Sequence, residues 1–191
     1  MKILFLGPER LSQIKISNFL KNDKNEVVRL SKDVANHSLD DDFQILISYG
    51  YKFKIQKNIL EKFKFNCYNL HISYLPWNKG ADPNFWSFAD NTPRGVSIHI
   101  INEKIDDGAV IYRKKTSYKN NDTLSSSYDD LLLCMEKLFF DKWNYIKSKN
   151  FKKKIFSNTG SFHNSKDIRN YSDFLINGWD TKVSTLIGIA K

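Results

Sequence analysis

Four short, mainly apolar runs in the first 72 residues constrain the fold more than any other feature of the chain. Two segments with apolar residues at helical spacing, 11–19 and 55–65, separate the first run from the second and the third from the fourth. Strands that are apolar along their length are typical of a parallel sheet with both faces covered. The runs are 2–6, 26–30, 43–49 and 67–72.

The second half of the chain adds further strands and a long helix. Residues 95–101 alternate between apolar and polar as a strand does, 109–118 form another strand, and 85–90 form a short helix. From Asp122 or Thr123 onward, apolar residues repeat every three or four positions, which is the strongest helical signal in the chain. The sequence therefore predicts an α/β fold with a Rossmann-like open twisted sheet, mostly parallel, and helices on both faces.

Length and composition predict one main domain over residues 1–149, with residues 150–191 as a C-terminal extension packed on it, because the composition turns polar after Lys149. Cys67 and Cys134 lie in apolar surroundings without CxxC spacing, as reduced, buried cysteines of a cytoplasmic protein do. The apolar run at the N-terminus is too short for a signal peptide or a membrane span.

The chain carries a net charge of +9, which favours anionic partners such as nucleic acid, a phosphorylated metabolite or a polyglutamated cofactor. Many of its lysines stand beside asparagines, a pattern that is also typical of a solvated surface. Charge alone therefore does not choose the ligand. It leaves a basic nucleic-acid-binding protein as an alternative, for which the lysine run 152–154 is the best feature.

Asn69 and His71 are the first candidates for chemistry. Residues two apart on a strand point to the same face, and ligands of open α/β sheets bind beyond the carboxyl ends of the strands. An amide can hold the oxygen of a tetrahedral intermediate, while an imidazole beside it takes the proton of an attacking amine. Taken alone, the two residues also fit a turn-closing asparagine and an interior histidine.

The turn at 106–108 offers a carboxylate near this pair. Asp106 follows the strand that bears His99, and a carboxylate near His71 would orient its ring or a water. An ordinary Asp-Gly turn is the alternative. The separations of these residues match no compact zinc motif, and the chain has no GxSxG elbow and no glycine-rich phosphate loop.

Aromatic residues between 74 and 88 could stack on a planar ligand, although we expect most of them to pack in the core. Trp77 is the one expected near a ligand, since it lies in a loop rich in proline and glycine. Lys79, in the same loop, is a candidate for contacting a phosphate.

Together these stretches resemble the N10-formyltetrahydrofolate-dependent formyltransferase family. The resemblance lies in an NxHxSxLP stretch, a GxSxH strand and a DxG turn, in that order and at the family's distances. It extends over essentially the whole chain. The matching segments are 69–76, 95–99 and 105–111, with Lys79-Gly80, Pro83 and Trp86 between them.

The resemblance implies roles for individual residues. Asn69, His71 and Asp106 would form the catalytic triad, with Asp107 in place of Asp106 if the register is off by one. N10-formyltetrahydrofolate would be the co-substrate, and no metal is implied. The positions expected to contact its pterin are Tyr51, Lys52, Phe53, Asn102, Glu103, Lys104 and Ile105, and those expected to bind the second substrate are Trp77, Asn78, Lys79 and Gly80.

Within the family, the chain looks most like short bacterial sugar N-formyltransferases. The segment 7–10 lacks the consecutive glycines of glycinamide ribonucleotide transformylase, and residues after Lys149 are too few for the tRNA-binding barrel of methionyl-tRNA formyltransferase. The resemblance implies a nucleotide-linked aminodideoxy sugar as acceptor, commonly dTDP-linked, used for surface polysaccharides such as the lipopolysaccharide O-antigen. It also implies a cytoplasmic enzyme without membrane or nucleic-acid partners, and enzymes of this kind often form homodimers.

Overall fold

The structure is a computed structural model that describes residues 1–156 and 160–190. The chain forms two compact units. Unit 1 comprises 1–71, 98–112 and 136–155, and unit 2 comprises 72–97, 113–135 and the rest of the chain from Phe156. Strands β6 (Gly95–Ile100) and β7 (Val110–Lys115) and helix α4 (Leu124–Lys147) contribute residues to both units.

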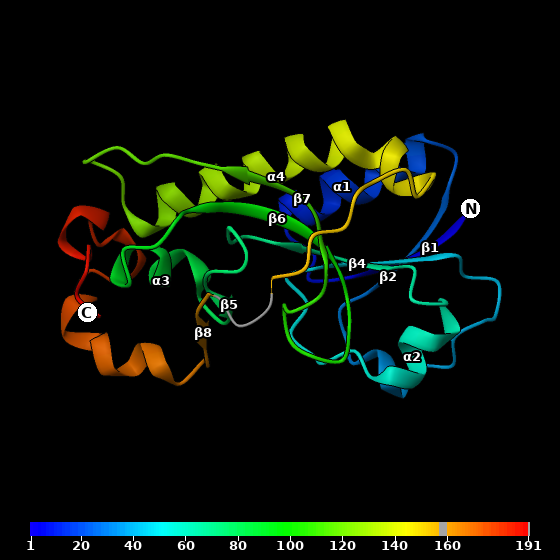
Figure 1. The fold of residues 1–191 in the computed structure, drawn as a ribbon, viewed down its shortest axis with the longest axis horizontal. Coiled ribbons are helices and arrows are strands. Elements are labelled where there is room, and N and C mark those ends of the chain that lie inside the picture. Colours follow the sequence, from blue (N-terminus) through cyan, green and yellow to red (C-terminus); the bar gives the residue numbers. More distant parts are fainter. Residues whose placement is uncertain (157–159, 191) are drawn as a thin grey trace. The chain divides into compact units, whose positions relative to one another are not determined.

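Within the described residues, the main sheet has the strand order β2-β1-β3-β4-β6-β7 (Figure 1). β1 pairs in parallel with β2 and β3, and β3 pairs in parallel with β4. β6 and β7 form an antiparallel hairpin, since the amide of Ile100 donates to Ala109 and that of Thr116 donates to Arg94. The strands are β1 (Lys2–Leu6), β2 (Glu26–Leu30), β3 (Ile45–Tyr49), β4 (Cys67–His71), β6 (Gly95–Ile100) and β7 (Val110–Lys115).

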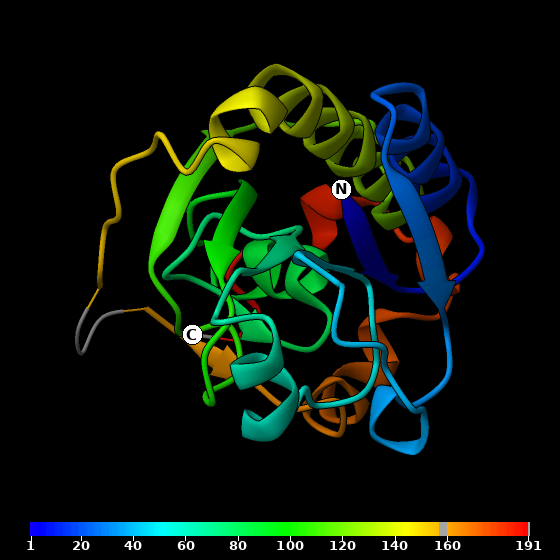
Figure 2. The same ribbon diagram turned by 90° about the vertical axis from the view of Figure 1, so that its right-hand side faces the viewer.

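Helices cover both faces of the sheet in unit 1. Figures 1 and 2 show α1 (Leu11–Asn22) and the later part of α4 (Leu124–Lys147) on one face, and α2 (Lys57–Lys62) on the other. The rings of Phe19 and Phe140, 4.4 Å apart, join α1 to α4. The predicted mostly parallel α/β fold is confirmed.

The helical periodicity of 55–65 gave the right buried face, whereas that of 11–19 did not, since Leu11 and Ile14 are exposed and α1 buries Ile16 and Leu20 instead. The apolar residues of 55–65 that were spaced to face inward are all buried, and they pack with Leu4, Leu46 and Cys67 in one core cluster. Burial raises the pKa of the Cys67 thiol to about 12, which suits an inert core residue. Cys134, expected to be buried as well, is partly exposed, because it lies toward the side of α4.

Unit 2 has its own core around α3 (Pro83–Ala89). Phe85, Trp86 and Phe88 are buried there. This agrees with the expectation that most of the aromatic residues between 74 and 88 pack in the core. The remaining elements are short: β5 (Lys79–Gly80), β8 (Phe162–His163), η1 (Val34–Asn36, in unit 1), η2 (Asp167–Phe174), η3 (Gly178–Asp180) and η4 (Val183–Thr185). None of the helices in the described ranges is both long and apolar enough to cross a bilayer.

Candidate active site in unit 1

Two polar side chains of unit 1 converge on one carboxylate. Asn69 and His71 lie two residues apart on β4, and Asp106 lies in the loop between β6 and β7. The Nδ2 atom of Asn69 is 3.0 Å from Oδ1 of Asp106, and Nε2 of His71 is 3.6 Å from Oδ2 of the same residue. The loop thus returns to the carboxyl end of β4.

The turn that carries Asp106 is built for close approach. Asp106 has a φ of 49°, in the left-handed region that few residues other than glycine adopt. At Gly108 a Cβ atom would overlap the carbonyl oxygen of Ile100, so only glycine lets the loop lie this close to β6. The DxG pattern therefore has a local physical cause.

His99 is a member of the cluster that residue-by-residue reasoning left without a role. Its Nε2 atom lies 3.2 Å from Nδ2 of Asn69 and 3.4 Å from Oδ1 of Asp106. Its Nδ1 atom lies 3.0 Å from the carbonyl oxygen of Ile100. The signal was present in the sequence, because the alternation of 95–101 placed this histidine on the polar side of its strand.

These contacts determine the tautomer of His99 and the orientation of the Asn69 amide. A carbonyl oxygen only accepts, so Nδ1 of His99 carries the proton and Nε2 of the neutral ring accepts from Asn69. The carboxylate of Asp106 also needs a donor, so the nitrogen of the Asn69 amide faces it. The amide of Asn69 is therefore held from two sides.

The cluster is largely removed from water. The side chains of His71, His99 and Asp106 are 9%, 2% and 10% exposed. Interactions between charges and dipoles are stronger in such surroundings than in water, which favours proton transfer and stabilisation of a developing oxyanion. Among residues 1–156 and 160–190, no three metal-ligating side chains are grouped so as to hold a metal ion.

The positions expected to contact the pterin lie on two segments of unit 1. Tyr51 and Ile101 pack against the same core cluster, and an ion pair of 3.7 Å joins Lys57, which follows the first segment, to Glu103 in the second. Phe53 and Ile105 are exposed, at 43% and 51%. Lys52, Asn102 and Lys104 are also exposed, and the amide of Lys104 donates to the side chain of Asn102.

The hydroxyl group of Tyr51 is already engaged within the protein. It accepts from the amide of Val34 and donates to the carbonyl of Lys32. Burial raises the pKa of this phenol. Its ring lies 5.4 Å from that of Phe53, so the pair presents an aromatic surface rather than a free hydroxyl.

The positions expected to bind the second substrate all lie in unit 2. Trp77 is partly exposed, and Lys79 and Gly80 form β5, paired with β8. Asn78 is only 1% exposed, and its amide bonds to Thr92 and Ser161. The structure therefore gives Asn78 a part in holding the loop in shape.

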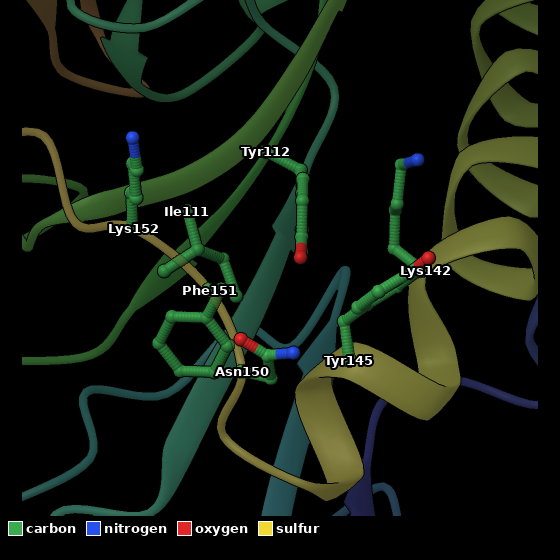
Figure 3. Close-up of a pocket in the computed structure, with 7 residues that line it drawn as sticks. All are labelled: Ile111, Tyr112, Lys142, Tyr145, Asn150, Phe151 and Lys152. Atoms are coloured by element: carbon green, nitrogen blue, oxygen red, sulfur yellow. The ribbon is translucent and has the colours of Figure 1, made fainter.

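A separate hollow of about 500 Å³ lies in unit 1 (Figure 3). The ammonium group of Lys142 is 5.6 Å from the ring of Tyr112 and 5.7 Å from that of Tyr145. None of the predicted site residues lines this hollow. Its lining residues are Ile111, Tyr112, Lys142, Tyr145, Asn150, Phe151 and Lys152.

The amino-acid sequence is similar to those of known formyl transferases. A family model described as "Formyl transferase" matches residues 6–141. The chain is similar to methionyl-tRNA formyltransferase of Prochlorococcus marinus strain MIT 9312, with 38% identity over 105 residues, which is 54% of this chain and 31% of that protein. The chain thus spans about a third of the length of that relative.

Two solved structures extend the comparison. The formyltransferase PseJ from Anoxybacillus kamchatkensis, in complex with UDP-4,6-dideoxy-4-formamido-L-AltNAc and tetrahydrofolate, is 42% identical with a TM-score of 0.94, covering 100% of both chains. The N-formyltransferase from Helicobacter canadensis, in complex with folinic acid and dTDP-3-aminofucose, is 22% identical with a TM-score of 0.72, covering 88% of this chain and 72% of that one. The second similarity concerns the fold alone.

Proposed function

Because the chain belongs to the formyl transferase family, we propose that it transfers the formyl group of N10-formyltetrahydrofolate to the amino group of a nucleotide-linked aminodideoxy sugar. The observation that carries the proposal is the convergence of Asn69, His71 and Asp106 at the end of β4. An amide donor, an imidazole and a carboxylate are the groups that direct formyl transfer to an amine requires.

Each member of the triad has one task in the proposed reaction. Asn69 donates an N–H to the formyl oxygen as negative charge develops there. His71 accepts the proton that the attacking amine loses and relays it to N10 of the folate, whose bond to the formyl carbon breaks, so that tetrahydrofolate leaves. Asp106 orients the ring of His71 and stabilises its protonated form.

The amide of Asn69 has only two N–H bonds, and both point to protein acceptors, Asp106 and His99. Donation to the formyl oxygen therefore exchanges one of these bonds. We assign the exchanged bond to Asp106, because its carboxylate can turn toward His71, whereas the Nδ1–H of His99 is fixed on the carbonyl of Ile100.

The surroundings fit the folate donor. Phe53 and Ile105 present exposed apolar surface on the two segments expected to flank the pterin, and planar ligands favour such walls. Backbone groups of 51–53 and 102–105 would supply the hydrogen bonds to the ring, since the Tyr51 hydroxyl is engaged within the protein.

The acceptor sugar is chosen by similarity. The 42% identical PseJ structure contains a UDP-linked 4-formamido sugar, whereas the sequence led us to expect a dTDP-linked one. UDP-linked 4-amino-4,6-dideoxy sugars are therefore the first to test, followed by their dTDP-linked counterparts. A cytoplasmic location, a homodimer and an extension over 150–191 also belong to the proposal, and light scattering of the purified protein tests the dimer.

The test is incubation with formyltetrahydrofolate and a panel of nucleotide-linked amino sugars, read by mass spectrometry for the added formyl group. The Asn69→Ala variant is the control for uncatalysed transfer. Methionyl-tRNA belongs in the panel, because a methionyl-tRNA formyltransferase is 38% identical over 54% of this chain. Formylation of methionyl-tRNA but of no sugar would replace the proposed acceptor.

A further inference from the structure

Two cationic side chains of β7 stack on a single tyrosine ring in unit 2. The guanidinium carbon of Arg113 lies 4.2 Å from the centre of the Tyr74 ring, and Nζ of Lys115 lies 5.5 Å from the same point. The two residues are two apart on a strand, so they share a face. The ring of Phe156 lies 4.7 Å from the Arg113 guanidinium.

Arg113 is held in place, yet among residues 1–156 and 160–190 only one hydrogen bond from its guanidinium to a protein acceptor is found. Its Nη1 donates to the carbonyl oxygen of Leu75, while a guanidinium has five N–H donors. In the part of the chain that the structure describes, no carboxylate lies within 4.0 Å of Arg113 or Lys115. The side chain of Arg113 is partly exposed, so its remaining donors are open to a ligand.

Arg94 in the same unit shows what an arginine with a folding role looks like. It is 6% exposed, and it donates to the side chain of Asn84 and to the carbonyls of Ser117 and Ser127. Burial lowers the pKa of its guanidinium. Arg113 differs because, within the described part of the chain, the carbonyl oxygen of Leu75 is its one hydrogen-bond acceptor, and because its side chain remains accessible.

We propose that Arg113 and Lys115 bind the diphosphate of the nucleotide-linked acceptor. A planar guanidinium pairs with two phosphate oxygens at once, and a neighbouring ammonium neutralises the second phosphate. Tyr74 holds both side chains toward one point, so little side-chain entropy is lost on binding. Tyr74 and Leu75 belong to the loop that carries Trp77 and Lys79, the positions expected to bind the acceptor.

This inference depends on the proposed function, which supplies the diphosphate. The experiment compares Arg113→Gln and Lys115→Gln with Lys114→Gln, which removes the same charge from the residue between them, on the other face of the strand. Arg113→Lys keeps the charge but loses the planar fork. KM and kcat are measured for UDP-amino sugar and formyltetrahydrofolate, and thermal unfolding shows whether each variant folds.

We expect Arg113→Gln to raise the KM for the UDP-amino sugar about tenfold or more and Lys115→Gln to raise it severalfold. The KM of Arg113→Lys for this sugar should lie between those of the wild type and Arg113→Gln, and the KM of Lys114→Gln should stay near the wild-type value. kcat and the KM for the folate change little. Equal KM values in Arg113→Gln and Lys114→Gln would overturn the inference while leaving the formyl transfer established.

Calorimetric titration with UDP keeps the two proposals separable, because it needs no turnover. Weaker UDP binding by Arg113→Gln and Lys115→Gln than by Lys114→Gln supports the site even if no sugar is formylated. UDP binding that is unchanged in both variants, or a loss confined to oligonucleotide binding, contradicts it.

Discussion

The Nδ2 atom of Asn69 lies 3.0 Å from Oδ1 of Asp106, although 37 residues separate them along the chain. The contact joins a strand of the main sheet to the loop between β6 and β7, so the loop's shape decides whether the site exists. Residue 107 is also an aspartate, so two carboxylates were candidates for the site. The contact with Asn69 identifies the carboxylate of Asp106 as the one that belongs to the cluster. This relationship leads directly to a test.

Asp106→Asn should lower kcat on the order of a hundredfold or more, since it removes the charge that orients and stabilises protonated His71. Asp107→Asn makes the same chemical change one residue later and should leave kcat close to the wild-type value. Steady-state kinetics with formyltetrahydrofolate and the amino sugar measure both. A larger loss in Asp107→Asn would show that the register is off by one.

His71→Ala should also lower kcat on the order of a hundredfold, because no other side chain then accepts the proton of the amine. The substrate KM values should change much less, since the imidazole acts mainly in the transition state. Single-turnover measurements separate chemistry from product release. Turnover near wild type in a folded His71→Ala protein would remove this residue from the mechanism.

His99→Ala should lower kcat by about tenfold, less than Asn69→Ala, because His99 acts by holding the Asn69 amide rather than by touching the substrate. The double variant Asn69→Ala/His99→Ala should then be scarcely slower than Asn69→Ala alone. Additive losses in this cycle would mean that His99 acts independently of Asn69. Melting temperatures of all three proteins control for folding, since His99 is buried.

The periodic features of the sequence predicted most of the fold. The apolar runs gave β1, β2, β3 and β4, and the three- and four-residue spacing gave α4 with its buried residues such as Leu131, Phe139 and Trp143. These elements are set by local burial patterns, which strand and helix periods encode directly.

The short elements were not predictable in the same way. β5 and β8 pair two-residue segments far apart in sequence, and the 3₁₀ helices η3 and η4 have three residues each, too few to show a helical period. Likewise, His99 was visible as a polar residue on a strand, but only the return of the loop toward β6 brings it to Asn69 and Asp106. Such contacts depend on tertiary structure, which spacing does not specify.

Gly108→Ala should destabilise the protein and lower activity, because the added Cβ overlaps the carbonyl oxygen of Ile100. The loop must then move away from β6, which draws Asp106 from Asn69. We expect a lower melting temperature and a kcat loss similar to that of Asp106→Asn. Gly188→Ala is the comparison without an overlap, since a Cβ there meets nothing within 4 Å, and its φ of 74°, in contrast to that of Gly108, leaves backbone strain as the cost of the substitution. Equal stability and activity in the Gly108 and Gly188 variants would contradict the close-approach argument.

Asp23 should make the stability of unit 1 depend on pH at the acidic end. Its carboxylate accepts from Lys147 at 2.7 Å and from the indole of Trp143 at 2.8 Å, which joins the end of α1 to α4. The bond from Lys147, followed by that from Trp143, lowers the pKa of Asp23 from 3.8 to about 2. The charged form is therefore favoured in the folded protein, so its contribution is complete above pH 4 and is lost as the pH falls toward 2.

Asp23→Asn should consequently lower the free energy of unfolding at pH 7 by about 1 kcal/mol, a value discounted because the side chain is one-third exposed. The difference from wild type should shrink as the pH falls from 4 through 2, because the Asp23 carboxyl of the folded wild-type protein becomes neutral below its pKa of about 2. Urea unfolding at a series of pH values measures it. Asp41→Asn, at a carboxylate that is 95% exposed, is the matched control and should show almost no difference at any pH. A pH-independent loss in Asp23→Asn would mean that packing of α1 on α4, rather than the charge of Asp23, is what the substitution disturbs.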